Sequence, residues 1–267
     1  MKFKAALFIS VFFLATQAIF SQDFEVAPIR LQYSANPGES ITKTIAVRNH
    51  SNKKTTITLR HRDYLIYRDG KMEVLPAEST KNTIARWITI NPSYVSLEPN
   101  EEMLVQVTMQ TPQDDYTSKW GIISLESAAE QTAFSADKSV KAGIAVLGRI
   151  DVYLSYNPLG VTDKVGINNI QEITTSDDTE RIFQVNLENT GDKITNCKVY
   201  LIASNLTTGE ETRFPTTELS AYPQSSRTIQ LNLPNELKPG QYSLAAILDH
   251  TGSSTLKGTQ MLIVVEK

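Results

Sequence analysis

Apolar and polar residues alternate with a period of two over most of this chain, and this pattern limits its fold more than any other feature. Residues 41–49 read Ile-Thr-Lys-Thr-Ile-Ala-Val-Arg-Asn, and residues 103–109 read Met-Leu-Val-Gln-Val-Thr-Met. Successive side chains of a β-strand point to opposite faces, so such segments bury one face and expose the other. No window of about twelve residues has its apolar positions at a convincing helical spacing. The sequence therefore predicts an all-β protein.

Clusters of turn-forming residues separate the predicted strands. Asn36-Pro37-Gly38 and Glu98-Pro99-Asn100 are two of them, and Asp69-Gly70 can supply the positive φ that a tight hairpin turn needs. The second half repeats this organisation, since residues 182–188 alternate and end in Asn189-Thr190-Gly191. Short strands that recur about every 8–12 residues are typical of a β-sandwich. We therefore expect two tandem immunoglobulin-like β-sandwich domains.

A secretory signal peptide is predicted at the start of the chain, where Lys2 and Lys4 precede an apolar segment at residues 5–19. Small and polar residues follow this segment, and we expect cleavage after Ser21. The apolar segment is shorter than the roughly 20 residues that a membrane-spanning helix needs. The sequence therefore predicts an exported protein.

The predicted parts of the chain are the signal peptide at 1–21, a first sandwich at 22–157 and a second sandwich at 158–267. We place the boundary at Asn157, because a long apolar strand gives way there to a Pro-Leu-Gly turn. About 245 mature residues are enough for two domains of ordinary length, each with its own core.

The composition argues against catalysis and against nucleic-acid binding. The chain has three histidines, one cysteine and a formal net charge of −3. No two histidines have the spacing of metal ligands, no nucleophile or phosphate-binding motif is present, and there is no basic stripe. We therefore expect a non-enzyme without cofactor, metal or membrane span, and Cys197 alone allows no internal disulfide. His61 and Asp63 share one side of a predicted strand, so a catalytic pair there is the alternative.

Four stretches of the first half resemble the PapD-like periplasmic chaperones that assemble pili, and they occur in the same order. Residues 28–33, a Pro-Gly turn and residues 45–49 resemble the opening strand pair of those chaperones. Residues 87–99 resemble an apolar strand followed by a proline and a Leu-x-Pro turn, and residues 119–125 (Lys-Trp-Gly-Ile-Ile-Ser-Leu) resemble the strand before the long loop. Residues 144–158 resemble the final strand and its exit into the second domain.

This resemblance implies a site for a partner's C-terminal carboxylate in the cleft between the domains. In that family, two cations hold the carboxylate, one from the first strand and one from the last strand of the first domain. The matching residues here are Arg30 and Arg149. The planar fork of arginine binds a carboxylate through two hydrogen bonds and keeps its charge. The alternative is that these arginines pair internally with acidic residues such as Asp151 or Glu25.

The resemblance also implies a strand edge that completes a partner's sheet by β-augmentation. The residues that would face the partner are Val140, Ala142, Ile144 and Val146, and Gly143 between them makes this strand thinner and more flexible than expected for such a chaperone. The implied function is that of a non-catalytic periplasmic chaperone-like or accessory subunit. It would bind the strand or C-terminus of an envelope or outer-membrane protein during assembly, as in pilus assembly.

A second resemblance points to a different function. The order of the Pro-Gly turn, the strand ending in Asn, the Arg-Asp-Gly hairpin and Trp-Gly-Ile-Ile is also similar to Gram-positive surface proteins that bind WxL proteins and peptidoglycan. Those proteins carry a C-terminal membrane helix, and residues 261–265 are too short to form one. A structural or adhesive surface module that binds envelope protein or peptidoglycan is therefore the alternative function.

The signal peptide gives the first testable prediction. Protein purified from the envelope fraction should begin at Gln22 or an adjacent residue, because the signal peptidase removes the apolar segment after export. N-terminal sequencing measures this directly. An intact Met1 on protein that remains in the cytoplasmic fraction would contradict the prediction.

Overall fold

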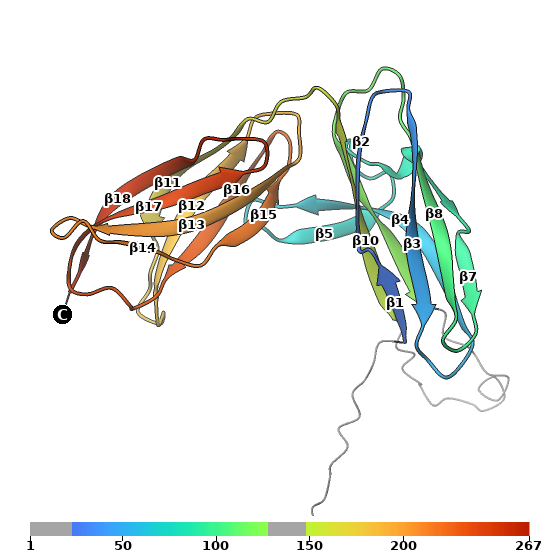
Figure 1. Ribbon diagram of the computed structural model, residues 1–267, viewed down its shortest axis with the longest axis horizontal. Coiled ribbons are helices and arrows are strands. Elements are labelled where there is room, and N and C mark those ends of the chain that lie inside the picture. The colour runs from blue at the N-terminus through green and yellow to red at the C-terminus, as the bar shows by residue number, and fades with distance from the viewer. Residues whose placement is uncertain (1–22, 128–147, 267) are drawn as a thin grey trace, which may run out of the picture.

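The structure, a computed structural model, describes residues 23–127 and 148–266. The predicted signal peptide and the predicted strand-edge residues, Val140, Ala142, Ile144 and Val146, lie outside these ranges. The described chain forms two β-sandwiches that meet near one end and are set at an angle (Figure 1). Across the described ranges, no helix is long and apolar enough to cross a membrane. The predicted fold class, two tandem immunoglobulin-like sandwiches, is confirmed.

The first sandwich packs a four-stranded sheet against a six-stranded sheet. The four-stranded sheet has the order β1 (Phe24–Ala27), β3 (Ser40–Asn49), β8 (Glu102–Gln110), β6 (Ile88–Asn91). The six-stranded sheet has the order β2 (Arg30–Ala35), β10 (Arg149–Pro158), β9 (Lys119–Ser127), β4 (Thr55–Ile66), β5 (Met72–Pro76), with β7 (Tyr94–Leu97) paired to the start of β4. A short 3-10 helix, η1 (Ala85–Trp87), precedes β6.

The second sandwich packs a three-stranded sheet against a five-stranded sheet. The three-stranded sheet has the order β11 (Val165–Glu172), β12 (Arg181–Asn189), β16 (Ser225–Leu233). The five-stranded sheet has the order β14 (Glu211–Arg213), β13 (Thr195–Asn205), β17 (Gly240–His250), β18 (Lys257–Val265), with β15 (Thr217–Ala221) also paired to β13. Each sandwich has its own apolar core.

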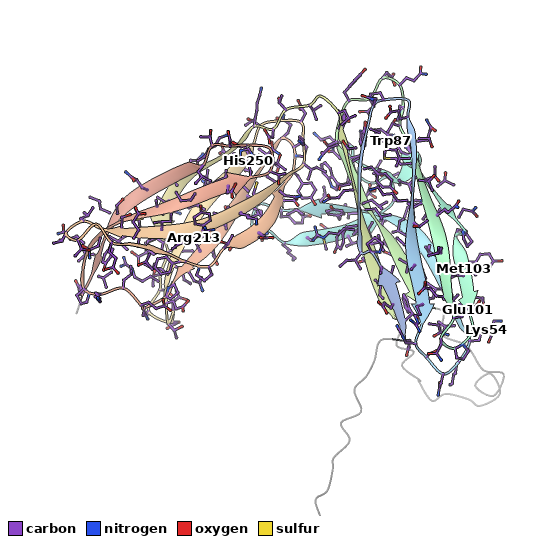
Figure 2. The ribbon with its side chains drawn as sticks, in the orientation of Figure 1. Lys54, Trp87, Glu101, Met103, Arg213 and His250 are labelled. Carbon is purple, nitrogen blue, oxygen red and sulfur yellow. The ribbon has the colours of Figure 1, made fainter. Side chains whose placement is uncertain are left out.

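Alternation along the strands fills both cores. On β3, Ile45 and Val47 are buried between the sheets, while Thr44 and Arg48 point to solvent. Removing apolar area from water contributes about 25 cal/mol per Å², which makes these inward residues the main source of stability. Trp87 packs edge-on against the buried Tyr156 in the first core, with ring centroids 5.4 Å apart (Figure 2).

The end of the second sandwich that faces the linker holds two buried titratable side chains, Cys197 and His250. The two residues are register partners on β13 and β17, and burial raises the pKa of Cys197 to about 11. The thiol therefore stays protonated at neutral pH, which makes it unreactive. His250 lies 3.3 Å (Nδ1 to Oδ2) from Asp163 of the linker, so the linker packs on the second sandwich (Figure 2).

The buried carboxylate of Asp63 is hydrogen-bonded to the loop before η1. This residue is fully buried on β4, and its two oxygens accept hydrogen bonds from the backbone N–H of Thr80 (2.9 Å) and the hydroxyls of Thr80 (3.1 Å) and Thr83 (2.7 Å). A buried carboxylate is stable when it is hydrogen-bonded in this way. Asp63 therefore holds the loop before η1 against β4.

β2 and the final strand of the first domain, β10, lie side by side. β2 and β10 pair in parallel, with Arg30 opposite Tyr153 and Ala35 opposite Pro158. Since β10 leads directly into the linker, both strands end at the side of the first sandwich that faces the second. This pairing places the outward side chains of β2 and β10 on the surface that borders the second domain.

Each sandwich contains a buried asparagine at the end of one strand. Asn49 ends β3, and its amide donates to the carbonyls of Lys53, Leu97 and Glu98 at 2.7–3.1 Å. Asn189 ends β12, donates to the carbonyls of Lys193 (2.8 Å) and Ala221 (2.9 Å), and accepts from the N–H of Gly191 (3.0 Å). Both side chains are fully buried and fix the turn that follows the strand.

The asparagine cluster predicts a specific loss of stability. Asn189→Asp should lower the free energy of unfolding of the second domain by about 3 kcal/mol, because a carboxylate cannot donate to the two buried carbonyls and would lie against them. The matched control, Asn168→Asp, changes an exposed residue of β11 in the same domain and should cost less than about 0.5 kcal/mol. Urea titration measures both changes, and equal effects would contradict the role given to Asn189.

Candidate functional site

A cluster of aromatic side chains joins the two domains. The hydroxyls of Tyr64 on β4 and Tyr222 after β15 lie 2.6 Å apart, and their rings meet edge-on with centroids 6.0 Å apart. The Trp120 ring also packs against Tyr222, at 4.9 Å between centroids. Burial raises the pKa of both tyrosines, so the hydroxyls stay protonated and keep their hydrogen bond over the ordinary pH range.

Polar groups at the end of β10 reinforce this junction. The side-chain amide of Asn157 donates to the carbonyl of Ile194 (3.0 Å), and its oxygen accepts from the N–H of Ile194 (2.9 Å). The hydroxyl of Ser118 lies 2.8 Å from the Asn157 side-chain oxygen and 2.7 Å from the carbonyl of Asp192. These contacts bind the loop before β13 of the second domain to the end of β10 and the start of β9.

The β4–β5 hairpin is a third contact, and it projects from the first sandwich toward the second (Figure 1). At its tip, the carbonyl of Arg68 accepts a hydrogen bond of 2.7 Å from the N–H of Thr228 on β16. Gly70 has φ +87°, and a Cβ there would lie 2.6 Å from Nη2 of Arg227. The absence of a side chain at Gly70 therefore lets the guanidinium of Arg227 approach the hairpin backbone.

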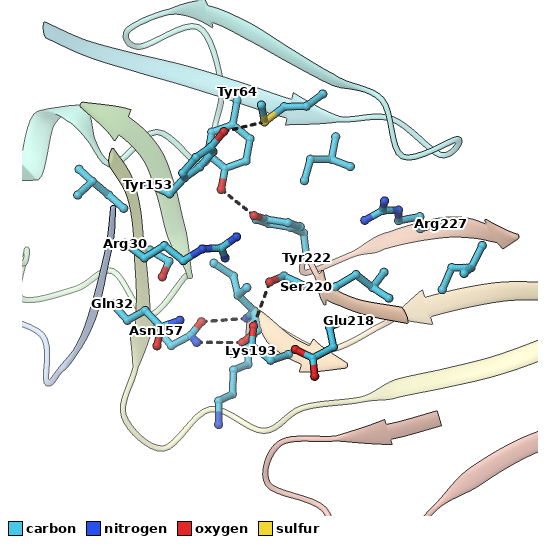
Figure 3. Close-up of a pocket in the computed structure, with 18 of the residues that line it drawn as sticks. Arg30, Gln32, Tyr64, Tyr153, Asn157, Lys193, Glu218, Ser220, Tyr222 and Arg227 are labelled. Carbon is cyan, nitrogen blue, oxygen red and sulfur yellow. Dashed lines mark hydrogen bonds between the residues drawn. The ribbon is translucent and has the colours of Figure 1, made fainter. Parts of the chain in front are cut away.

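These contacts enclose a cleft of about 1160 Å³ between the domains (Figure 3). Its first wall is the outward face of β2, β10 and the hairpin, and its second wall is formed by β15, β16 and the start of β13. The charged side chains that line it are Arg30, Arg68, Asp69, Lys193, Glu218 and Arg227.

The cleft has an excess of positive charge. Within the described ranges, none of its four basic side chains forms an ion pair with a carboxylate. One of its two acidic residues, Glu218, lies 3.3 Å from Lys198, and the other, Asp69, accepts the backbone N–H of Lys71 at 2.9 Å. Walls of low dielectric strengthen the field of unpaired charges. The cleft is therefore suited to an anionic group.

Arg30 points into this cleft. Its Cζ lies 5.8 Å from the centroid of the Tyr153 ring, and the close-up shows its guanidinium directed toward Tyr222 (Figure 3). Stacking on an aromatic face orients an arginine and leaves its N–H groups available for a ligand. Arg30, predicted from the sequence as a binding residue, thus has the position and the available donors that such a role needs.

Arg149 does not lie with Arg30, and the predicted pairing of these two arginines in one anion site is wrong. The register places Tyr153, not Arg149, opposite Arg30. Arg149 lies four residues earlier on β10, about 13 Å away along the strand at roughly 3.3 Å per residue. It binds Asp151 through two hydrogen bonds, at 2.9 and 3.0 Å, and Ser124 also donates to Asp151.

The alternative kept for these arginines therefore holds for one of them. Arg149 pairs with Asp151, as that alternative supposed. Glu25 is the other acidic residue that the alternative named. Its Oε2 lies 2.8 Å from Nε2 of His50, and Glu25 does not pair with Arg30. Sequence reasoning missed the contribution of Tyr153, Tyr222 and the hairpin, because none of them has a local pattern that marks it as part of a site.

The described residues contain no cluster of three or more histidine, cysteine or acidic side chains that could hold a metal ion. The cleft between the domains offers guanidinium donors, aromatic faces and apolar walls, which are groups suited to binding a partner.

Two solved structures with a similar fold come from fimbrial chaperone systems. One is a class 5 fimbriae chaperone, CfaA, with a TM-score of 0.51, 13% sequence identity, and coverage of 91% of this chain and 99% of that chain. Another comes from a chaperone–tip adhesin complex of CFA/I fimbriae biogenesis, with a TM-score of 0.51, 12% identity, and coverage of 90% and 97%. The described chain therefore has a fold similar to that of these chaperones over both domains.

The sequence itself gives no match to a family model. It also matches no curated protein.

The aromatic junction predicts energetic coupling between the domains. Tyr64→Phe and Tyr222→Phe should each destabilise the full chain, and the double variant should lose about 1 kcal/mol less than the sum, because each single change leaves one buried hydroxyl without its partner. Unfolding free energies of the three variants measure this coupling. Tyr67, whose hydroxyl contacts Glu73 on the same hairpin, is the control. Tyr67→Phe should add to Tyr222→Phe without coupling, and additivity in both pairs would contradict the account.

Proposed function

We propose that this chain is a non-catalytic, chaperone-like protein of the periplasm that binds a subunit of a surface fibre during assembly. The proposal is supported by three independent features. The N-terminal sequence predicts export, the fold over both domains is that of fimbrial chaperones, and the cleft carries unpaired guanidinium groups. The two similar structures come from a fimbriae chaperone and a chaperone–adhesin complex, which makes a fibre subunit the partner to test first.

The single observation that carries the proposal is that Arg30 borders the cleft without a carboxylate partner among the described residues. A guanidinium that borders a cleft, stacks on Tyr153 and has no carboxylate partner among the described residues is prepared for an external anion. A protein C-terminus supplies a carboxylate at the end of an extended chain, and a cleft that is open on one side can admit it. We propose that Arg30 binds the C-terminal carboxylate of the partner.

We further propose that the segment before β10 lends its edge to the partner's sheet. Val140, Ala142, Ile144 and Val146 stay a prediction here, since they lie outside the described residues. Gly148, next to this segment, is described, and its carbonyl accepts the N–H of Ser127 on β9 at 3.0 Å. A partner strand in this position would continue along the first residues of β10, whose edge pairs with β2 only from Tyr153 onward, so its end would approach Arg30.

The comparison of the two arginines tests the proposal. Arg30→Gln should weaken partner binding by at least about tenfold, because a charge-assisted hydrogen bond to a carboxylate is lost. Arg149→Gln should change binding less than about threefold, since Arg149 is already paired with Asp151. Both variants should unfold within about 0.5 kcal/mol of the unmodified protein.

The measurement is co-purification of the partner from the envelope, followed by titration of that partner against each variant. Equal binding by Arg30→Gln and the unmodified protein would contradict the role of Arg30. A loss confined to Arg149→Gln would place the anion site at the other end of β10.

A further inference from the structure

The wall of the cleft beside Arg30 is apolar. Ile66 on β4 and Met72 on β5 are register partners, so their side chains lie next to each other on one face of the hairpin, and both line the cleft. Tyr64 and Val74 are the next pair on the same face. Met72 is 40% exposed, so it retains apolar surface that a ligand could cover.

The side chain of Tyr153 contacts both this apolar face and the guanidinium of Arg30. The centroid of the Tyr153 ring lies 5.8 Å from Cζ of Arg30. The hydroxyl of Tyr153 lies 3.9 Å from Sδ of Met72. An anion bound by Arg30 would therefore lie near the Tyr153 ring, whose hydroxyl contacts the thioether of Met72. A residue whose carboxylate reached Arg30 could direct its own side chain onto Met72 and Ile66.

We propose that the cleft face of the β4–β5 hairpin is a side-chain subsite that selects partners whose C-terminal residue is large and apolar. This inference rests on the carboxylate role proposed for Arg30. Met72 and Ile66 are its specificity-determining residues, and Tyr153 separates the subsite from the carboxylate.

The chemistry of the wall decides the class of terminal residue. Methionine is flexible and polarisable, so it adapts to apolar groups and makes favourable contacts with aromatic rings. A basic terminal side chain would be repelled by the unpaired Arg30, Arg68 and Arg227 of the cleft. An acidic terminal side chain would lose water against Met72 without gaining a hydrogen bond there. Leucine, methionine, phenylalanine and tyrosine remain as suitable terminal residues.

The test uses synthetic peptides and the full mature chain. Four fluorescein-labelled peptides share the alternating sequence Ser-Val-Thr-Val-Thr-Val-Thr and end in Phe, Ala, Lys or Phe-amide. Fluorescence anisotropy gives the affinity of each. We expect the Phe peptide to bind about tenfold more tightly than the Ala peptide, since burying most of a large apolar side chain contributes that much. The Lys and amide peptides should bind more weakly still.

Two variants connect this preference to the hairpin. Met72→Gln keeps the length of the side chain but makes it polar, and it should reduce the ratio of the Phe and Ala affinities to about two. The matched control is Leu104→Gln, which changes a residue that is 61% exposed on β8 of the other sheet, and it should leave the ratio unchanged.

The outcomes separate this inference from the proposed function. If amidation and Arg30→Gln both weaken binding while the Phe and Ala peptides bind equally, the subsite is wrong and the carboxylate site stands. The same holds if Met72→Gln leaves the Phe preference intact. If amidation and Arg30→Gln have no effect, or if no peptide binds, the carboxylate site itself fails and the subsite with it.

Discussion

The contact between Tyr64 and Tyr222 is the interaction on which the rest of the site depends. Each sandwich has a complete core of its own, so nothing within either core fixes the angle between them. The hydroxyl bond of 2.6 Å, with Trp120 packed on Tyr222, sets that angle in a buried environment. Buried, fully paired hydroxyls are costly to separate, and the cleft therefore has a defined shape before any partner arrives.

A preformed cleft explains how several unpaired basic side chains can lie within one cleft. Unpaired guanidinium groups that line one cleft repel each other, and a flexible junction would let them move apart. Here the hairpin tip holds Arg227 against Gly70, and the ring of Tyr153 holds Arg30. These side chains therefore keep their place in the cleft of the free protein, and a bound anion would offset their like charges. This arrangement favours binding without requiring a change in the fold of either domain.

The sequence was sufficient for the strands and for which face each one buries, because side-chain alternation is local. Asp69-Gly70 correctly predicted the hairpin, and Asn49 and Asn189 marked the ends of two strands. The register was not predictable, since a shift by two or four residues along β10 keeps the same alternation but changes the neighbour of Arg30. Arg149 was named because it matches the last-strand cation of the resembling family, and only the register shows that Tyr153 lies opposite Arg30. The domain contacts of Tyr222 and Thr228 were also missed, because they join residues more than about 150 positions apart.

Site-specific photo-cross-linking tests the central claim, that the cleft receives the end of a partner chain. A photoreactive amino acid would replace Gln32, which lines the cleft on β2, or Thr89, which is exposed on β6 of the opposite sheet. After irradiation of intact cells, mass spectrometry would identify the cross-linked peptide of the partner. The account predicts that position 32 captures the C-terminal peptide of one partner and that position 89 does not. Cross-links from position 32 to internal segments only, or equal capture from position 89, would contradict it.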